Sequence, residues 1–369
     1  MVRVATVATR LTTLDTLFGF SAWDLQATGT LGAVMDGIRG EEGKHRHIKE
    51  GYQYVGGFPA HLWKLATADE NYRLLSEGIK TFWKRWEIIK SHLTEQINYV
   101  SIGPGTGEKD RAILQRLQEV AGTAKILYVP IDLSPDLLRI AVIESTRELK
   151  RDRLVVMPIQ LDITRPKAIK ALKELLDELS AGTPKLVSVL GNTLANFRDD
   201  AAALALITKL MTHRGDRLLI ELATATEATP ELARQARAEY EGSGSFRRFV
   251  MATLSDFTNC RLDSPEMVKY DSIAADGVIE ITANYIAPKA GKVIFRDDEH
   301  FTMKAKEKIE LLITRKYTDA ALAKLTRGFV EIENAPESYD DRFGLVTKLL
   351  AVTPSGDPQP RPKTHPVGG

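Results

Sequence analysis

A glycine-rich turn near residue 100 carries residue types that suit the binding of a nucleotide. Residues 97–110 read INYVSIGPGTGEKD, in which an apolar run leads into the turn and an amphipathic helix begins near Glu108. Gly103 and Gly105 lack Cβ atoms, so the backbone there can turn sharply and approach a ligand closely. The helix behind them directs unpaired N–H groups towards that ligand. The pattern predicts a nucleotide-binding strand, turn and helix.

Two acidic residues follow the next two apolar runs of the chain. Asp132 ends the first of these runs and Asp162 ends the second. In a doubly wound α/β sheet the carboxyl ends of the strands face the ligand, and an acid after the second strand can accept hydrogen bonds from ribose hydroxyls. The turn reads GxGxG and continues into Glu108 and Lys109, without the third glycine of the dinucleotide pattern GxGxxG, which favours S-adenosylmethionine (SAM) as the cofactor. In the simpler alternative, the glycines form only a tight turn and the two acids cap helices.

An alternating series of strands and helices is needed to position these residues. Strand-like and helix-like segments alternate from residue 99 to residue 222, which indicates βαβ units and a parallel sheet. An amphipathic helix over residues 78–93 precedes them. We expect strands over residues 99–102, 126–131, 155–160, 185–190 and 217–222. We expect the intervening helices over residues 108–120, 135–149, 166–179 and 199–211.

The pattern changes after Thr224, where we expect a second, smaller α+β domain that binds the substrate. A charged helix over 230–240 is followed by a flexible glycine-containing stretch over 241–245, and then come strands, a helix and a last strand over 278–286, 292–295, 318–324 and 343–352. The cofactor-binding core is expected to comprise residues 76–226 and 316–352. The substrate-binding domain is expected to comprise residues 20–75 and 227–315. Residues 353–369 hold prolines and glycines with few apolar residues, so we expect a disordered tail.

The composition limits the classes of partner. The 369 residues include 50 basic and 49 acidic side chains, a balance that argues against nucleic acid as an obligatory partner. Cys260 is the only cysteine, and no histidine spacing resembles a metal-binding motif, so neither a disulfide framework nor a catalytic metal is expected. We find no signal peptide and no apolar stretch long enough to span a bilayer. The sequence therefore favours a cytoplasmic enzyme that acts on a small molecule, without a membrane or nucleic acid.

The cofactor motifs resemble those of the histidine-specific SAM-dependent methyltransferases, the family of the enzyme that trimethylates the α-amino group of histidine in ergothioneine biosynthesis. The family's GSGTSEKT-like turn is similar to residues 103–110, and its YVPxDxS segment to residues 128–134. The resemblance implies a class I methyltransferase fold in which Gly103 and Gly105 approach the methionine part of SAM. It further implies that Asp132 binds the ribose, that Asp162 accepts from the adenine amino group, and that Lys109 lies near the cofactor. Lys109 is equally well explained as a surface residue of the first helical turn.

The substrate motifs resemble the family only in part. The family's LGSTIGN loop, whose asparagine holds the amino and carboxylate groups of the substrate, is similar to residues 190–196. The resemblance makes Asn196 the best candidate substrate residue and places Gly191 beside the cofactor, although Asn196 also suits a helix cap. It also places Tyr52, Tyr72 and Tyr240 in the substrate pocket. A buried tyrosine with one ordinary hydrogen-bond partner is the alternative for all three.

The clearest departure from the family lies in residues 309–317. Histidine-methylating members carry a Glu-Ile-Ser in this run, whose acid and hydroxyl bind the imidazole, whereas this chain has Leu312 in place of the acid and keeps a hydroxyl in Thr314. A leucine accepts no hydrogen bond, and each bond lost costs roughly 1 to 3 kcal/mol of discrimination. Histidine is therefore an unfavoured substrate, unless Glu310 replaces the missing acid. An amino acid with an apolar or aromatic side chain fits Leu312 better.

The sequence thus predicts a SAM-dependent N-methyltransferase that acts on an amino acid or an amino-acid-derived natural product. In this mechanism Asn196 orients the amino nitrogen, Tyr52 accepts or relays a proton through water, and a dry pocket keeps the amine neutral. Two alternatives stay open. In the first, SAM is used for methylation at carbon or oxygen or for an intramolecular displacement. In the second, the substrate is a peptide or a protein.

Overall fold

The computed structural model describes residues 10–15, 20–24, 30–40, 45–180, 182–332 and 343–352. A sheet of 13 strands runs through these residues, and its central part has the strand order β6-β4-β3-β7-β8 with all neighbours parallel. These strands are β3 (Asn98–Ile102), β4 (Ile126–Asp132), β6 (Ile159–Gln160), β7 (Lys185–Val189) and β8 (Arg217–Ala225). The short strand β5 (Leu154–Val156) pairs with β4, and the hairpin of β1 (Arg10–Asp15) and β2 (Phe20–Asp24) continues the sheet beyond β6.

The other side of β8 is covered by an antiparallel strand. β15 (Phe343–Val352) pairs with β8 along most of its length, and β14 (Phe329–Glu331) pairs with β15. The order β6-β4-β3-β7-β8-β15-β14, with only β15 reversed against β8, is that of a Rossmann-like class I methyltransferase sheet. The α/β fold class expected from the sequence is therefore confirmed.

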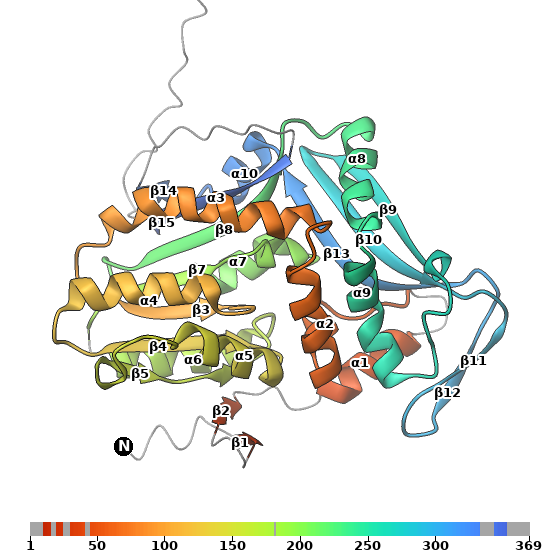
Figure 1. Ribbon diagram of the computed structural model, residues 1–369, viewed down its shortest axis with the longest axis horizontal. Coiled ribbons are helices and arrows are strands. Elements are labelled where there is room, and N and C mark those ends of the chain that lie inside the picture. The colour runs from red at the N-terminus through yellow and green to blue at the C-terminus, as the bar shows by residue number, and fades with distance from the viewer. Residues whose placement is uncertain are drawn as a thin grey trace, which may run out of the picture.

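Helices cover both faces of this sheet, as Figure 1 shows for α3 and α4 on the near face and for α6 and α7 behind it. Successive residues of a strand point to opposite faces, so Tyr99 packs with the near helices while Val100 packs with the far ones. Serine or aspartate caps begin several helices, such as Ser134 before α5, whose Oγ accepts from the Leu137 N–H. The helices are α3 (Arg73–Ile89), α4 (Glu108–Ala121), α5 (Pro135–Ser145), α6 (Pro166–Ser180), α7 (Asp200–Thr208) and α10 (Asp319–Leu325).

The remaining elements gather beyond the carboxyl end of β8 and share a second core. Strand β13 joins the sheet through one parallel pairing, between Tyr317 and Thr224, and continues as an antiparallel sheet β13-β10-β9. The helices α1, α2, α8 and α9 lie beside this sheet (Figure 1). The elements are α1 (Thr30–Arg39), α2 (Gly57–Thr67), α8 (Pro230–Glu241), α9 (Gly244–Phe257), β9 (Val268–Ala275), β10 (Val278–Ile286), β11 (Gly291–Ile294), β12 (His300–Met303) and β13 (Lys308–Tyr317).

The residues expected to form a separate substrate-binding domain thus share one apolar core, but their strands extend the main sheet. A distinct second domain and its boundaries stay a prediction. The glycine-containing stretch over 241–245 joins the end of α8 to the start of α9, where the fully buried Ser243 caps α9 and donates its hydroxyl to Asp69. Its expected flexibility stays a prediction. The disordered tail expected over 353–369 lies outside the described residues.

Candidate active site

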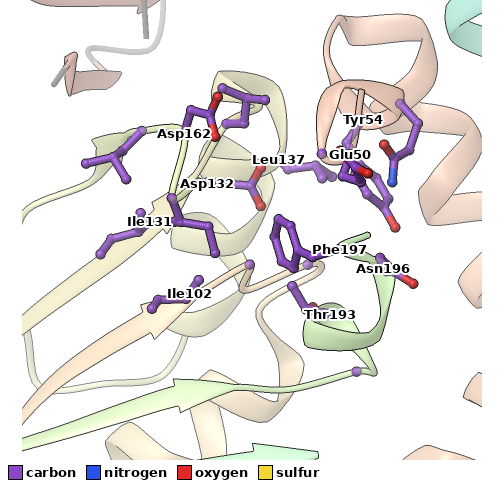
Figure 2. Close-up of a pocket in the computed structure, with 18 of the residues that line it drawn as sticks. Glu50, Tyr54, Ile102, Ile131, Asp132, Leu137, Asp162, Thr193, Asn196 and Phe197 are labelled. Atoms are coloured by element: carbon purple, nitrogen blue, oxygen red, sulfur yellow. The ribbon is translucent and has the colours of Figure 1, made fainter. Parts of the chain in front are cut away.

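A pocket opens at the carboxyl ends of β3, β4, β6 and β7, where the sequence places its glycine turn and its acids. It holds about 720 Å³ of empty space, part of which is open to solvent. Figure 2 shows Asp132 and Asp162 on one side of this pocket and Thr193 and Asn196 on another, with Glu50 and Tyr54 closing it from the amino-terminal segment. We call it the cofactor pocket. Five of the six residues expected to bind the cofactor line it: Gly103, Gly105, Asp132, Asp162 and Gly191.

The glycine turn has backbone conformations that favour glycine at each lining position. Gly103 has φ +64° and Gly105 has φ +59°, both in the left-handed region. A Cβ at Gly103 would lie 2.9 Å from Cγ2 of Thr193, whereas a Cβ at Gly105 would meet no protein atom within 4 Å. The first glycine therefore allows a loop to pack against the turn, and the second leaves room in the pocket for a ligand.

Asp132 ends β4 with a carboxyl group that suits hydroxyl donors. Its Oδ1 accepts from the Ser134 N–H at 2.8 Å. Burial raises the pKa of Asp132 to about 7, because the nearby backbone N–H groups only partly offset the loss of solvent. Two ribose hydroxyls donating to this carboxylate would stabilise its ionised form.

Asp162 lies two residues after the end of β6, and its carboxylate accepts hydrogen bonds from several protein donors. Its Oδ1 accepts from the N–H and the hydroxyl of Thr164, at 3.0 and 2.6 Å. Its Oδ2 accepts from Lys49 Nζ at 2.8 Å and from the hydroxyl of Tyr52 at 3.3 Å. Burial alone would raise the pKa of Asp162. The hydrogen bonds from Lys49 and Thr164 outweigh that effect, so the pKa is lowered. The role of Asp162 towards adenine stays a prediction.

Tyr52 lies beside this acid. It is fully buried, its hydroxyl donates to Asp162, and it is not among the residues that line the cofactor pocket. Burial, with the neighbouring Asp162 carboxylate, raises the pKa of the Tyr52 hydroxyl. The structure thus does not bring Tyr52 together with the other expected substrate residues, and its expected place in the substrate pocket is not where the side chain lies.

A second, smaller pocket adjoins the first and holds the other expected substrate residues. Its empty space of about 270 Å³ includes a part that is open to solvent, and we call it the inner pocket. The two pockets share Tyr54, Trp63, Gly191 and Asn196. The inner pocket also contains Tyr72, Leu74, Asn192, Tyr240, Phe246, Leu312 and Thr314. No side chain in this set carries a charge.

The polar groups of the inner pocket differ in their partners. The hydroxyl of Tyr240 is buried and meets no partner at hydrogen-bond distance among the described residues. Burial raises its pKa, and the nearby Thr314 hydroxyl opposes that rise. Thr314 Oγ1 accepts from Nδ2 of Asn192 at 3.1 Å, and the same amide donates to the carbonyl of Arg315 at 3.2 Å. The unpaired Tyr240 hydroxyl is thus a group available to a ligand in this pocket.

Glu310, the alternative acid, is held elsewhere. Its side chain forms an ion pair with Arg198 and lies 3.0 Å from Nε2 of His45. It is not among the residues of the inner pocket. Leu312 therefore faces that pocket without a neighbouring carboxylate from β13.

Sequence reasoning missed several lining residues. Glu50, Gln53, Tyr54 and Trp63 come from the segment before α2 and from α2 itself, and Thr193 and Phe197 flank Asn196. Trp63 also lines the inner pocket, and its ring packs against those of Tyr54 and Phe249. Lys109 is the one expected cofactor residue that lines neither pocket, because its ammonium is paired with Glu221.

A family model described as "Histidine-specific methyltransferase, SAM-dependent" matches residues 38–346. The chain belongs to this family. The protein is accordingly a SAM-dependent methyltransferase, as the sequence predicted. The cofactor pocket fits SAM, because it combines a glycine turn with room beside Gly105, the carboxyl group of Asp132, which hydroxyl groups could approach, and apolar walls at Leu133 and Ile163.

Solved structures of methyltransferases are also similar to this chain. A SAM-dependent methyltransferase from Clostridium acetobutylicum shares 12% identity over 79% of this chain and 97% of its own, with a TM-score of 0.36. The CcbJ methyltransferase from Streptomyces caelestis shares 10% identity over 71% of this chain and 92% of its own, with a TM-score of 0.34. A sugar N-methyltransferase from a Streptoalloteichus species shares 12% identity over 72% of this chain and 83% of its own, with a TM-score of 0.30. Scores this low carry no argument about function. A search of curated proteins found no match.

Among the described residues, no helix combines the length and the apolar character needed to cross a membrane. The same residues contain no group of three or more histidine, cysteine, aspartate or glutamate side chains placed to hold a metal ion.

Proposed function

We propose that this methyltransferase acts on the amino group of an amino acid, or of an amino-acid-derived natural product, whose side chain is less polar than that of histidine. The observation that carries the proposal is the uncharged inner pocket beside the cofactor pocket, with Leu312 facing it and Glu310 paired with Arg198. An imidazole in such a pocket would leave its N–H without a carboxylate acceptor. An aromatic ring would instead pack against Tyr72, Phe246 and Leu312.

The residues shared by the two pockets account for the methyl transfer. SAM, when bound, supplies a methyl group activated by a sulfonium sulfur. Asn196 belongs to both pockets, so its amide would orient the amino nitrogen of the substrate towards the cofactor. The apolar walls of the inner pocket disfavour the charged ammonium form and so keep the nucleophilic nitrogen neutral.

Tyr52 was expected to relay a proton, but its hydroxyl donates to Asp162, and Tyr52 is not among the residues that line the inner pocket. We therefore leave it outside the mechanism. The amine that reaches the site in its neutral form needs no residue to remove a proton before it attacks. The proton that the product amine carries is lost to solvent after release.

The Tyr240 hydroxyl refines the substrate class. A buried hydroxyl without a partner costs roughly 1 to 3 kcal/mol, and a substrate atom that hydrogen-bonds to it recovers that cost. The preferred side chain therefore combines an aromatic body with one polar atom, as in tryptophan or tyrosine. Phenylalanine has the same body without that atom.

Calorimetric titration tests this proposal. S-adenosylhomocysteine (SAH) is bound first, and histidine, tryptophan, tyrosine and phenylalanine follow as second ligands. We expect tryptophan or tyrosine to bind at least about tenfold more tightly than phenylalanine, and histidine to bind weakest. The preference over phenylalanine should disappear in Tyr240→Phe, which keeps the ring. Tight histidine binding by the unaltered protein would overturn the proposal.

A further inference from the structure

A buried ion pair lies directly behind the turn that the two pockets share. Glu221 on β8 is fully buried, and its Oε2 is paired with Nζ of Lys109 from the first turn of α4. The same oxygen accepts from the N–H of Gly191 at 2.7 Å. Its other oxygen lies 3.4 Å from the hydroxyl of Thr347 on β15. Glu221 thus connects three elements of the core.

Gly191 is the part of this network that reaches the ligands. It lines both the cofactor pocket and the inner pocket, and its φ of +67° places it in the left-handed region. The following residue, Asn192, also has a positive φ, and its N–H donates to the carbonyl of Glu221 at 3.2 Å. Glu221 therefore holds the start of the loop that carries Asn196, through its side chain and through its backbone.

Lys109 is placed to support Glu221 rather than to touch a ligand. Its ammonium is paired with Glu221 and lies 5.0 Å from the ring centroid of Phe82, on the side of α3. Neither Lys109 nor Glu221 is among the residues that line the cofactor pocket or the inner pocket. A carboxylate as buried as that of Glu221 is strongly destabilising when it has no cationic partner. The ammonium of Lys109 provides that partner.

We propose that Lys109 and Glu221 are a positioning pair: Glu221 fixes the Gly191 turn for both ligands, and Lys109 acts on cofactor binding only through Glu221. This goes beyond the proposed substrate, because the pair would act in the same way for any methyl acceptor. The competing assignment is a direct contact between the lysine ammonium and the bound cofactor.

A double-mutant cycle separates these two assignments. The variants are Lys109→Met, Glu221→Gln and the two combined, and the readouts are the Kd for SAH and the melting temperature. Glutamine keeps an oxygen that accepts from the Gly191 N–H, but it has no charge to be left unpaired. We expect Lys109→Met to weaken SAH binding about tenfold, within the range for coupled residues of one network, and to lower the melting temperature.

The combined variant decides the matter. If Lys109 acts through Glu221, adding Glu221→Gln to Lys109→Met restores SAH affinity and melting temperature to those of Glu221→Gln alone. If Lys109 contacts the cofactor, the combined variant binds SAH as weakly as Lys109→Met, and the proposal is overturned. An unchanged SAH affinity in Lys109→Met also overturns it. Should Lys109→Met fail to fold, the comparison of the combined variant with Glu221→Gln still decides between the two.

A matched control exists at the other end of the sheet. Lys185 and Asp216 form a second buried pair, with Nζ and Oδ2 3.3 Å apart, and neither residue lines a pocket. Lys185→Met should lower the melting temperature without changing the Kd for SAH. An equal loss of SAH affinity in Lys185→Met and Lys109→Met would attribute both to general destabilisation and refute a positioning role.

Discussion

The affinity of this protein for SAH should rise with pH through neutrality, because of Asp132. Burial raises the pKa of this carboxyl to about 7, so both of its protonation states are populated near neutral pH in the free protein. If the ribose hydroxyls donate to this carboxylate, as the sequence predicts, they stabilise its ionised form, and binding lowers the pKa of Asp132. Binding therefore releases a proton. The affinity for SAH increases with pH until the pH exceeds the pKa of Asp132 in the free protein.

The size of the effect follows from the ionised fraction. With a pKa of about 7, that fraction is about 9% at pH 6 and about 91% at pH 8, a tenfold difference that corresponds to about 1.4 kcal/mol. If only the ionised form binds ribose well, the Kd for SAH should be about tenfold larger at pH 6 than at pH 8. Above pH 8 the Kd should level off.

Calorimetry with SAH at pH 6, 7 and 8, at constant ionic strength, measures this dependence. Asp132→Asn is the matched control, because its amide has nearly the same shape and does not titrate. We expect this variant to bind more weakly at pH 8 and to show a flat profile. The reasoning is refuted if the unaltered protein and Asp132→Asn show the same slope, since the titrating group would then lie elsewhere.

Three further outcomes follow from the geometry. Gly103→Ala should weaken SAH binding more than Gly122→Ala, because both have a positive φ but only the Cβ at Gly103 would approach Thr193; equal effects in a titration would contradict the packing argument. Leu312→Glu should strengthen histidine binding by about tenfold or more, as a charged hydrogen bond would, and unchanged binding would place Leu312 outside the site. Asn196→Ala should lower the rate of methyl transfer while leaving the Kd for SAH within about threefold, whereas a loss of SAH affinity as large as that of Asp132→Ala would make Asn196 a cofactor residue.

The cofactor pocket could be predicted from the sequence because its signals are local. A glycine turn between a strand and a helix, and an acid at the end of β4, are set by neighbouring residues, and both lie where they were expected. The strand β13 escaped prediction because nearly all its side chains are buried, including Lys316, so it shows no alternation of apolar and polar residues. Lys316 is accommodated by an ion pair with Glu239, which is distant in the sequence.

The orientations of the candidate substrate residues depend on contacts with residues that are distant in the sequence. The spacing of Tyr52 resembled that of a substrate residue, but its side chain is drawn to Asp162. Likewise, Glu310 of β13 is held outside the inner pocket by an ion pair with Arg198, which lies two residues after Asn196 in the loop before α7. Such ion pairs and hydrogen bonds have no periodicity along a sequence, so only the folded structure displays them.

The central claim is that the methyl acceptor is an amino acid with an aromatic or apolar side chain. The most direct test is incubation with SAM and an equal mixture of tryptophan, tyrosine and histidine, followed by mass spectrometry of the products. The account predicts N-methylated tryptophan or tyrosine, with histidine left unmodified. Methylation of histidine in preference to both aromatic amino acids would contradict it.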